Sequence, residues 1–310
     1  MTVIIRDFRP ETSDLAAMVR FRRTTLPYNL TTAASVADNV ASVPAEAHSR
    51  FLVAEDSTTG EIVGALQARL HHTSTEPGHA SCIPVVLPDR RGQGIGSALR
   101  RAGEEHLAAL GATTLHAWTL DARSAAYAEK LGYAPAHSMH YQRLDLVDRV
   151  LPQPPPLPEG LTLISAARLG DDPRPLYDAD AEATEDEPNS VPVVVEPYEE
   201  WLVSVWNKPV LDHGLTTLAV TDDGTVASFS LAHTDGETRY LSGMTGTRRD
   251  FRGLGLAKAA KHDSLVRARA AGYREAFTSN DDVNGPMLAI NKWFGYEHGN
   301  TEVEYVRTVD

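Results

Sequence analysis

The feature that most constrains this chain is a glycine-bearing segment that occurs twice. Arg91-Gly92-Gln93-Gly94-Ile95-Gly96 is matched 161 residues later by Arg252-Gly253-Leu254-Gly255-Leu256-Ala257. Two later landmarks keep this spacing to within two residues: Gly111 with Gly272, and Gly132-Tyr133 with Gly295-Tyr296. Three landmarks in constant register predict a duplicated domain.

Each segment lies between a run typical of a strand and an amphipathic run typical of a helix. In the second copy these runs are residues 239–244 and 256–271. A turn at the start of a helix directs backbone N–H groups to one point, where the helix dipole adds partial positive charge. A phosphate is the expected occupant. Gly253 and Gly255 would let it approach the backbone closely.

These residues resemble the signature of the GNAT acyltransferase superfamily, which is Gln or Arg, two residues, Gly, one residue, then Gly or Ala. The first copy carries Arg91, Gly94 and Gly96, and the second carries Arg252, Gly255 and Ala257. The resemblance implies that each loop binds the pyrophosphate of coenzyme A. It also implies a sheet that splays between its fourth and fifth strands, with the pantetheine arm in the gap.

The amino-acid sequence of the first copy is similar to the amino half of tandem acetyltransferases of the mycothiol synthase type. Its similar stretches are residues 116–121 and 126–133, whereas residues 291–296 of the second copy look like a more general acetyltransferase half. The resemblance implies the following cofactor-binding residues: Val85, Val86, Arg91, Gly92, Gln93, Gly94, Ile95, Gly96 and Ser97 in the first copy, and Met244, Thr245, Gly246, Thr247, Arg252, Gly253, Leu254, Gly255, Leu256, Ala257, Lys258, Asn280 and Asn284 in the second.

Strand-like and helix-like runs follow the same order in both copies. This favours an α/β fold with two tandem GNAT domains, each a mixed, mostly antiparallel sheet flanked by helices. Residues 151–160 hold five prolines, which favour an extended spacer. The predicted domains are therefore residues 1–149 and 161–310, with a linker at 150–160.

Composition excludes several classes of protein. The formal net charge of −13 disfavours nucleic acid and fits a cationic small molecule better. No apolar run is long enough to cross a membrane, and the start of the chain lacks the apolar core of a signal peptide, so a cytoplasmic protein is expected. Cys82 is the only cysteine, which excludes a disulfide within the chain and a thiolate metal cluster. No metal is expected, and Cys82 is interpreted as an inert core residue.

The tyrosine that many members of the family use to protonate the departing thiolate is missing from its usual place. That place is four residues before the glycine of the closing Gly-aromatic pair, where the two copies have Ala128 and Asn291. Tyr127 is one position off and is expected to pack in the core. Asn291 can hydrogen-bond a thioester but cannot act as a general acid, and it makes a mycothiol synthase proper less expected.

The second copy carries the more complete set of side chains that could bind the cofactor. Asn284 and Asn291 are two helical turns apart and Asn280 precedes them, so the three amides are expected to face coenzyme A. They could instead be capping amides. Asp121 occupies the place of Asn284 in the first copy, where a carboxylate would repel an anionic cofactor. We therefore expect the second domain to carry turnover and the first to bind acetyl-CoA or to be structural.

An acidic run, Glu185-Asp186-Glu187, precedes the second loop. It is predicted to meet the ammonium group of the acceptor, with Asp186 or Glu185 as the base, although a solvated acidic loop is an equal alternative. His233 is a further candidate base. The candidate catalytic residues are thus Asn291, Asp186 and Glu185.

The function expected from these features is acetyl-CoA-dependent transfer of an acetyl group to the primary amine of a small, cationic molecule, such as an antibiotic, an amino sugar or a specialised metabolite. The alternatives are a non-catalytic coenzyme A sensor or scaffold, and a tandem enzyme with a different acyl donor. A monomer or a homodimer is expected.

Overall fold

The computed structural model describes residues 2–72, 74, 76–186 and 194–309. The chain forms two compact units. The first contains Met1–Met139 and Thr301–Asp310, and the second contains His140–Pro188 and Val195–Asn300. No helix among the described residues is both long and apolar enough to cross a membrane. Glu187 of the predicted acidic run lies outside the described residues.

The sheet of the first unit is mostly antiparallel. Its strands lie in the order β1 (Val3–Asp7), β2 (Arg50–Asp56), β3 (Ile62–Leu70), β4 (His79–Val86), β5 (Thr114–Thr119) and the end of β12 (Glu297–Thr308). Only the β4–β5 pair of this unit is parallel among the pairings described. Alternation along β4 gives the sheet two different faces, because Ala80 and Cys82 are buried against one side while Ile83 and Val85 point to the other.

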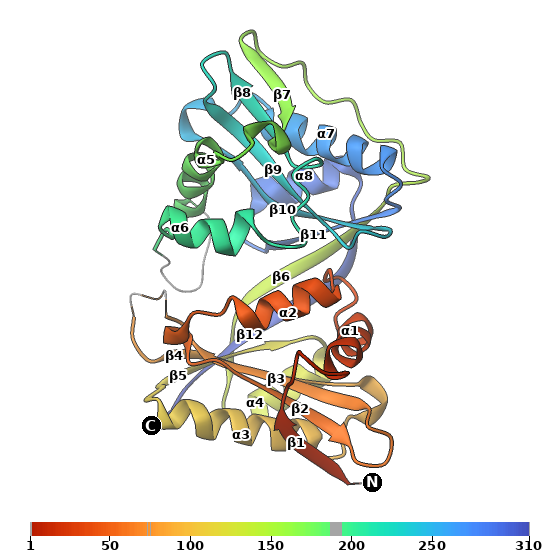
Figure 1. Cartoon of the computed structure of the whole chain (residues 1–310), viewed down its shortest axis with the longest axis vertical. Helices are drawn as coiled ribbons and strands as arrows, with labels where there is room; N and C mark the ends of the chain where they lie inside the picture. Colours follow the sequence, from red (N-terminus) through yellow and green to blue (C-terminus); the bar gives the residue numbers. More distant parts are fainter. Residues whose placement is uncertain (1, 73, 75, 187–193, 310) are drawn as a thin grey trace. The chain divides into compact units, whose positions relative to one another are not determined.

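Four helices cover this sheet. Helices α1 (Asp14–Thr25) and α2 (Ala33–Ala41) lie on the side away from α3 (Ile95–Ala109), as Figure 1 shows, and α4 (Ala122–Lys130) follows β5. Leu99 and Leu107 of α3 are fully buried with Leu52, at the spacing of a helix face that packs on a sheet. Two short 3-10 turns, Ala45–Ala47 and Pro88–Arg90, complete the unit. Cys82 lies in this core, where burial raises the pKa of its thiol to about 12, as expected for an inert residue.

The second unit repeats the plan. Its strands lie in the order β6 (Ala134–Asp145), β11 (Glu275–Asp281), β10 (Arg239–Thr247), β9 (Val226–Thr234), β8 (Thr217–Thr221) and β7 (Leu161–Ser165). Its helices are α5 (Arg174–Glu185), α6 (Tyr198–Trp201), α7 (Leu256–Ala270) and α8 (Gly285–Phe294), with short turns at Ala166–Leu169, Leu202–Trp206 and Arg249–Phe251. The predicted fold class, an α/β fold with a mixed, mostly antiparallel sheet flanked by helices, is confirmed in each unit.

The two halves of the sequence exchange their last strands. Val303–Thr308 of β12 pairs antiparallel with β5 in the first unit, and β6 lies beside β11 in the second, where Arg143 is 2.7 Å from Glu275. The compact units therefore do not coincide with residues 1–149 and 161–310. Periodicity marks β6 and β12 as strands, but it carries no information about which open sheet edge each one joins.

The acidic stretch before the second loop contains the helix α5, which the sequence pattern did not predict. The charged side chains of Asp178, Glu182 and Glu185 obscure the helical pattern in the sequence. Leu176, Ala179 and Ala183 are nevertheless buried at helical spacing and form an apolar face. The end of α5 consequently carries Glu185 and Asp186 at a defined place, next to the second glycine loop.

Candidate cofactor site

The glycine loop of the first unit has the geometry of a phosphate cradle. Gly92 and Gly94 both have φ of +83°, a left-handed conformation that favours glycine. Gly94 is the N-cap of α3, so the first N–H groups of that helix point out of the loop. Arg91 donates from Nε to the carbonyl of Val86 at 3.3 Å, which ties the loop to the end of β4.

The loop of the second unit has the same backbone. Gly253 and Gly255 have φ of +77°, and Gly255 is the N-cap of α7. Arg252 donates from Nε to the carbonyl of Thr247 at 3.1 Å, the counterpart of the bond between Arg91 and Val86. The duplication predicted from glycine spacing thus extends to individual hydrogen bonds.

In both units the parallel strand pair beside the loop opens into a gap. Pairing of β4 with β5 ends at Ser81 and His116, although β4 continues to Val86. Pairing of β10 with β11 ends at Leu241 and Phe277. The edge of β4 beyond Ser81 therefore offers backbone groups that β5 does not use, at the end of the strand that leads into the loop.

A cavity of about 420 Å³ occupies this position in the first unit. It is lined by the predicted cofactor residues Val85, Val86, Arg91, Gly92, Gly94, Gly96 and Ser97, together with Pro84, Arg90, Trp118, Leu120, Arg123, Ser124 and Tyr127. Gln93 is exposed, and Ile95 is buried against Gly64 instead of lining the cavity. The volume lies in the range of small-molecule and cofactor sites.

Tyr127 faces this cavity, and its predicted place in the core is wrong. Its side chain is 39% exposed, and its hydroxyl lies 2.7 Å from Oγ of Ser97 at the start of α3. The neighbouring Ala128 takes the core position. Helix α4 begins at Ala122, capped by Asp121, and this start turns Tyr127 towards the loop. The count back from Gly132 identifies a position in the sequence but does not indicate which side chain of α4 faces the cavity.

Positive charge gathers at the first loop. A Cβ on Gly92 would lie 2.8 Å from Nη2 of Arg123, so this guanidinium hangs over the turn. In the part of the chain that the structure describes, Arg123 has no ion pair. Asp121 is not the repulsive group that its position suggested, because its carboxylate pairs with Arg91 and accepts from the amide of Ser124 at 2.8 Å. These bonds lower the pKa of Asp121.

The second loop is covered and its charge is neutralised. A Cβ on Gly255 would lie 2.7 Å from Cγ of Pro155, so the proline-rich segment crosses the turn. Arg252 pairs with Asp186, and Arg249 contacts Glu185 and Asp186, each at 2.9 Å. The two guanidinium groups hold the pKa of Asp186 near 2, its hydrogen bonds to Arg249 being the larger cause.

These pairs contradict the interpretation of Glu185 and Asp186 as partners of a substrate ammonium group. Both carboxylates already face arginines of the loop, and a carboxylate with so low a pKa is a poor base at neutral pH. His233 lies beside Gly243 of β10, and burial lowers the pKa of its imidazole to about 4. The sequence pattern missed these contacts because Asp186 and Arg252 are far apart along the chain.

The asparagines of the second unit do assemble, but inside the protein. Asn291 is 0% exposed; its Oδ1 accepts from Nζ of Lys261 at 2.6 Å, and its Nδ2 donates to Asn280 at 2.6 Å and to Gln142 at 3.0 Å. Asn284 caps α8 by accepting from the amide of Met287 at 3.3 Å. Asn291 is closed off from solvent by its own network, which does not support its predicted contact with a thioester.

The remaining residues predicted for the second cofactor site are largely engaged within the unit. Met244 packs on a buried cluster, Gly246 faces Phe229, and Leu256 is buried. The hydroxyls of Thr245 and Thr247 lie 3.1 Å and 2.8 Å from those of Ser230 and Ser228. Lys258 lies over the ring of Trp293, and Leu254 is exposed.

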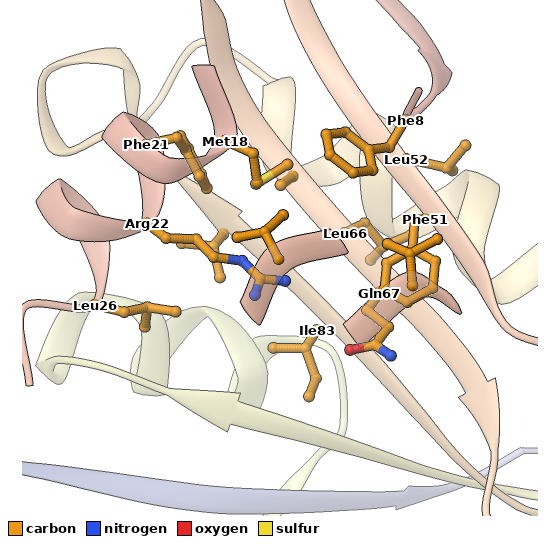
Figure 2. A pocket seen from close by; sticks show the side chains of 14 residues that line it. Phe8, Met18, Phe21, Arg22, Leu26, Phe51, Leu52, Leu66, Gln67 and Ile83 are labelled. Carbon is orange, nitrogen blue, oxygen red and sulfur yellow. The ribbon is translucent and has the colours of Figure 1, made fainter. Parts of the chain in front are cut away.

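A second, smaller cavity lies on the other face of the first unit, between α1, α2 and the sheet. It measures about 220 Å³ and shares Val85 with the larger one. Its walls are mostly apolar, and Figure 2 shows the Arg22 guanidinium and the Gln67 amide among them. Burial lowers the pKa of Arg22. Within the described residues this guanidinium has no ion pair.

Comparisons with known proteins agree with this geometry. Residues 16–133 match the model of the Acetyltransferase (GNAT) family. No curated protein sequence matches the chain. Among solved structures, a GCN5-related N-acetyltransferase from Sphaerobacter thermophilus has a TM-score of 0.72 at 22% identity, over 99% of this chain and 95% of that one. The whole chain thus has the fold of a known N-acetyltransferase.

Two further structures share the fold. A tandem GNAT protein from the clavulanic acid biosynthesis pathway has a TM-score of 0.74 at 21% identity, over 99% of this chain and 98% of that one. A glucosamine N-acetyltransferase region of a fungal multi-domain β-N-acetylglucosaminidase has a TM-score of 0.65 at 15% identity, over 98% of this chain and 38% of that one. Residues 16–133 thus match the model of a family of acetyltransferases, whose members use an acyl-CoA cosubstrate, and the chain as a whole has the fold of tandem GNAT proteins.

Proposed function

We propose that the first unit is the catalytic half, and that it transfers an acetyl group from acetyl-CoA to the primary amine of a small molecule. The observation that carries this proposal is the meeting of two cavities at Val85 of β4. One cavity contains the phosphate loop and the other lies on the opposite face of the sheet. A thioester in the first and an amine in the second would meet at the strand between them. This differs from our expectation that the second domain carries turnover.

The residues of the larger cavity fit coenzyme A. The glycine loop supplies backbone N–H groups for the pyrophosphate, and Arg123 adds a cation above the turn. The unpaired edge of β4 lies beside the gap, where backbone N–H groups would stabilise the oxyanion of acyl transfer. Acetyl-CoA supplies the activated acyl group, and its carbon–sulfur bond breaks as the bond to the amine nitrogen forms.

Tyr127 is the residue best placed to hold a proton for the departing sulfur. Its hydroxyl lines the cofactor cavity, and Ser97 fixes it from the start of α3. A neutral phenol donates a proton, which the asparagine of the second unit cannot do. Tyr127 therefore fills the role that the sequence count had left empty, from one position earlier on the helix.

The smaller cavity suggests what the acceptor carries besides its amine. Arg22 is surrounded by apolar side chains such as Phe21, Met18 and Ile83 (Figure 2). A half-buried guanidinium without an ion pair among the described residues favours an anionic partner, and a carboxylate can accept two parallel hydrogen bonds from it. We therefore propose a small acceptor with an apolar body and a carboxylate, in place of the cationic molecule expected from net charge.

A matched pair of loop variants tests the proposal. Gly94→Glu and Gly255→Glu place the same negative charge at the same point of the two loops. We expect Gly94→Glu to abolish binding of coenzyme A by calorimetry and to lower thiol release from acetyl-CoA by at least about 100-fold. Gly255→Glu is expected to leave both within a few-fold of the unmodified protein.

If Gly255→Glu abolished thiol release and Gly94→Glu did not, the second unit would be the catalytic half. Binding of coenzyme A at the first loop without thiol release across a panel of amines, with and without carboxylates, would favour the alternative of a non-catalytic coenzyme A sensor. Circular dichroism of both variants separates loss of function from loss of fold.

A further inference from the structure

Three histidines converge in the first unit, apart from both loops. His71 follows β3, His79 is the first residue of β4, and His116 is in β5. One ligand nitrogen from each can be chosen so that all three lie within 4.8 Å of one another. Their ring centroids are 4.8 to 6.4 Å apart. Neither cavity described above includes them.

Strand pairing brings these distant residues together. The amide of His71 donates to the carbonyl of His79 at 2.9 Å, where β3 turns into β4. The parallel register opposes Ser81 to His116, at the last pair before the strands separate. His79 and Ser81 share a face of β4 because they are two residues apart. The cluster therefore lies on a well-paired part of the sheet.

Two carboxylates hold the rings from outside. Glu304 of β12 lies with Oε1 2.9 Å from Nδ1 of His116, and both residues are buried. Glu76 lies 3.2 Å from Nε2 of His79. Each carboxylate therefore occupies one ring nitrogen and directs the other inwards. The inward nitrogens, Nδ1 of His79 and Nε2 of His116, are 2.8 Å apart.

This arrangement is the one found around histidines that bind metals. A metal-bound imidazole usually donates its second N–H to a carboxylate or carbonyl, which fixes the ring. With Zn–N bonds of about 2.0–2.1 Å, tetrahedral ligand nitrogens lie roughly 3.4 Å apart. Here one pair of ligand nitrogens is 2.8 Å apart and all three lie within 4.8 Å of one another, so the nitrogens already lie near that spacing. Glu304 and Glu76 place negative charge beside the cluster, and Arg69 places positive charge beside His71.

We infer that His71, His79 and His116 form a binding site for a divalent transition metal ion, with Zn²⁺ as the expected occupant. The side chains of Glu304 and Glu76 orient His116 and His79. Three neutral imidazoles suit Zn²⁺ better than Mg²⁺ or Ca²⁺, which prefer oxygen ligands. Three protein ligands leave the fourth position for water or another ligand. Our expectation of no metal rested on cysteine, and the intervals from His71 to His79 to His116 match no local metal motif.

The test uses the full-length, untagged chain after removal of metals with a chelator. We expect calorimetric titration with Zn²⁺ to show one site per chain, and Co²⁺ to give the visible absorption of a tetrahedral nitrogen site. His79→Ala and His116→Ala should abolish both signals. His106→Ala is the control, because this histidine of α3 bonds to the carbonyl of His48, outside the cluster.

Glu304→Gln keeps the fold testable if removal of a buried histidine unfolds the unit. It should bind Zn²⁺ about 10- to 100-fold more weakly, since it removes the carboxylate that orients His116. Absence of Zn²⁺ binding by the unmodified chain would overturn the inference. So would binding that His79→Ala, His116→Ala and Glu304→Gln leave as strong as in His106→Ala.

Discussion

The two glycine loops of this chain share a backbone and differ in what surrounds them. At the first loop Gly94 is exposed, Arg123 lies above the turn, and a cavity opens towards Tyr127. At the second loop Pro155 lies on Gly255, and Asp186 pairs with Arg252 as Asp121 pairs with Arg91 at the first loop, so the two loops differ in the proline cover and in Arg123. In the second unit Lys261 and Asn291 form a buried network with Asn280 of β11. The backbone of the turn alone therefore does not make a cofactor site, because side chains from distant segments decide whether the turn is accessible.

Ala128 in the first half and its counterpart Asn291 in the second half also differ in their surroundings. Ala128 packs in the core and leaves Tyr127 at the cavity. Asn291 lies at the core position of α8 and recruits Lys261, which takes a place on α7 that corresponds to Arg100 on α3. The first half thus has a tyrosine hydroxyl at the cavity, whereas the second half has a buried network of polar side chains at the corresponding place.

The largest expected effect is on the stability of the second unit. Asn291→Leu leaves Nζ of Lys261 buried without its hydrogen-bond partner, which should destabilise the unit by about 2–4 kcal/mol. Lys261→Met combined with Asn291→Leu removes both buried groups and should recover most of that loss. Denaturant unfolding of the two variants measures the difference. Equal stability of the single and double variants would mean that the network contributes little.

The same pair predicts a pH dependence. Burial lowers the pKa of Lys261 to about 7, below its ordinary value of 10.5. Between these pH values the unfolded chain binds a proton that the folded chain does not, so this group makes stability rise with pH from about 7 to 10.5. Unfolding free energies at several pH values should show this rise in the unmodified chain, and the Lys261→Met, Asn291→Leu double variant should lack it.

Tyr127→Phe tests the proposed proton donor of the first unit. Loss of the hydroxyl should lower turnover by about 10- to 100-fold and leave affinity for coenzyme A nearly unchanged. Ser97→Ala is the matched control, because it removes the same hydrogen bond but keeps the acidic proton, so its effect should be smaller. Thiol release and calorimetry measure the two quantities. An unchanged rate in Tyr127→Phe would remove the proposed proton donor.

Arg22→Met tests the acceptor cavity of the first unit. It should raise KM for a carboxylate-bearing amine by about 10-fold, the effect of one charged hydrogen bond, and spare an amine without a carboxylate. Arg20→Met is the control, since Arg20 is exposed on the same helix. Steady-state kinetics with the paired acceptors measure the effect. Equal KM changes for both acceptors would argue against recognition of an anionic group.

The smallest effect is expected from opening the second loop. Pro155→Gly with Asp186→Asn removes the cover from Gly255 and one negative charge from Arg252. A weak second binding event for coenzyme A should then appear in calorimetry. Pro152→Gly, in the same segment, serves as the control. If the opened variant binds no more coenzyme A than this control, the second loop has lost its affinity for another reason.

Several features followed from sequence because they depend on neighbours along the chain. The glycines at 92, 94, 253 and 255 stand where the backbone turns left-handed, and each loop leads into a helix of the predicted register. Alternation and turns located the strands. The duplication, the sheet class and the glycine turn at the start of each helix all rest on such local rules, so one sequence was enough to predict them.

The tertiary structure alone decided how these parts are used. The exchange of β6 and β12, the cover of Pro155 and the pairing of Asp186 with Arg252 join residues that are distant in sequence. The three histidines meet only through strand register. The packing of α4 places Ala128 in the core and Tyr127 at the cavity, where a core position had been expected for Tyr127. Such contacts depend on packing between segments, and local patterns of charge and hydrophobicity do not specify that packing.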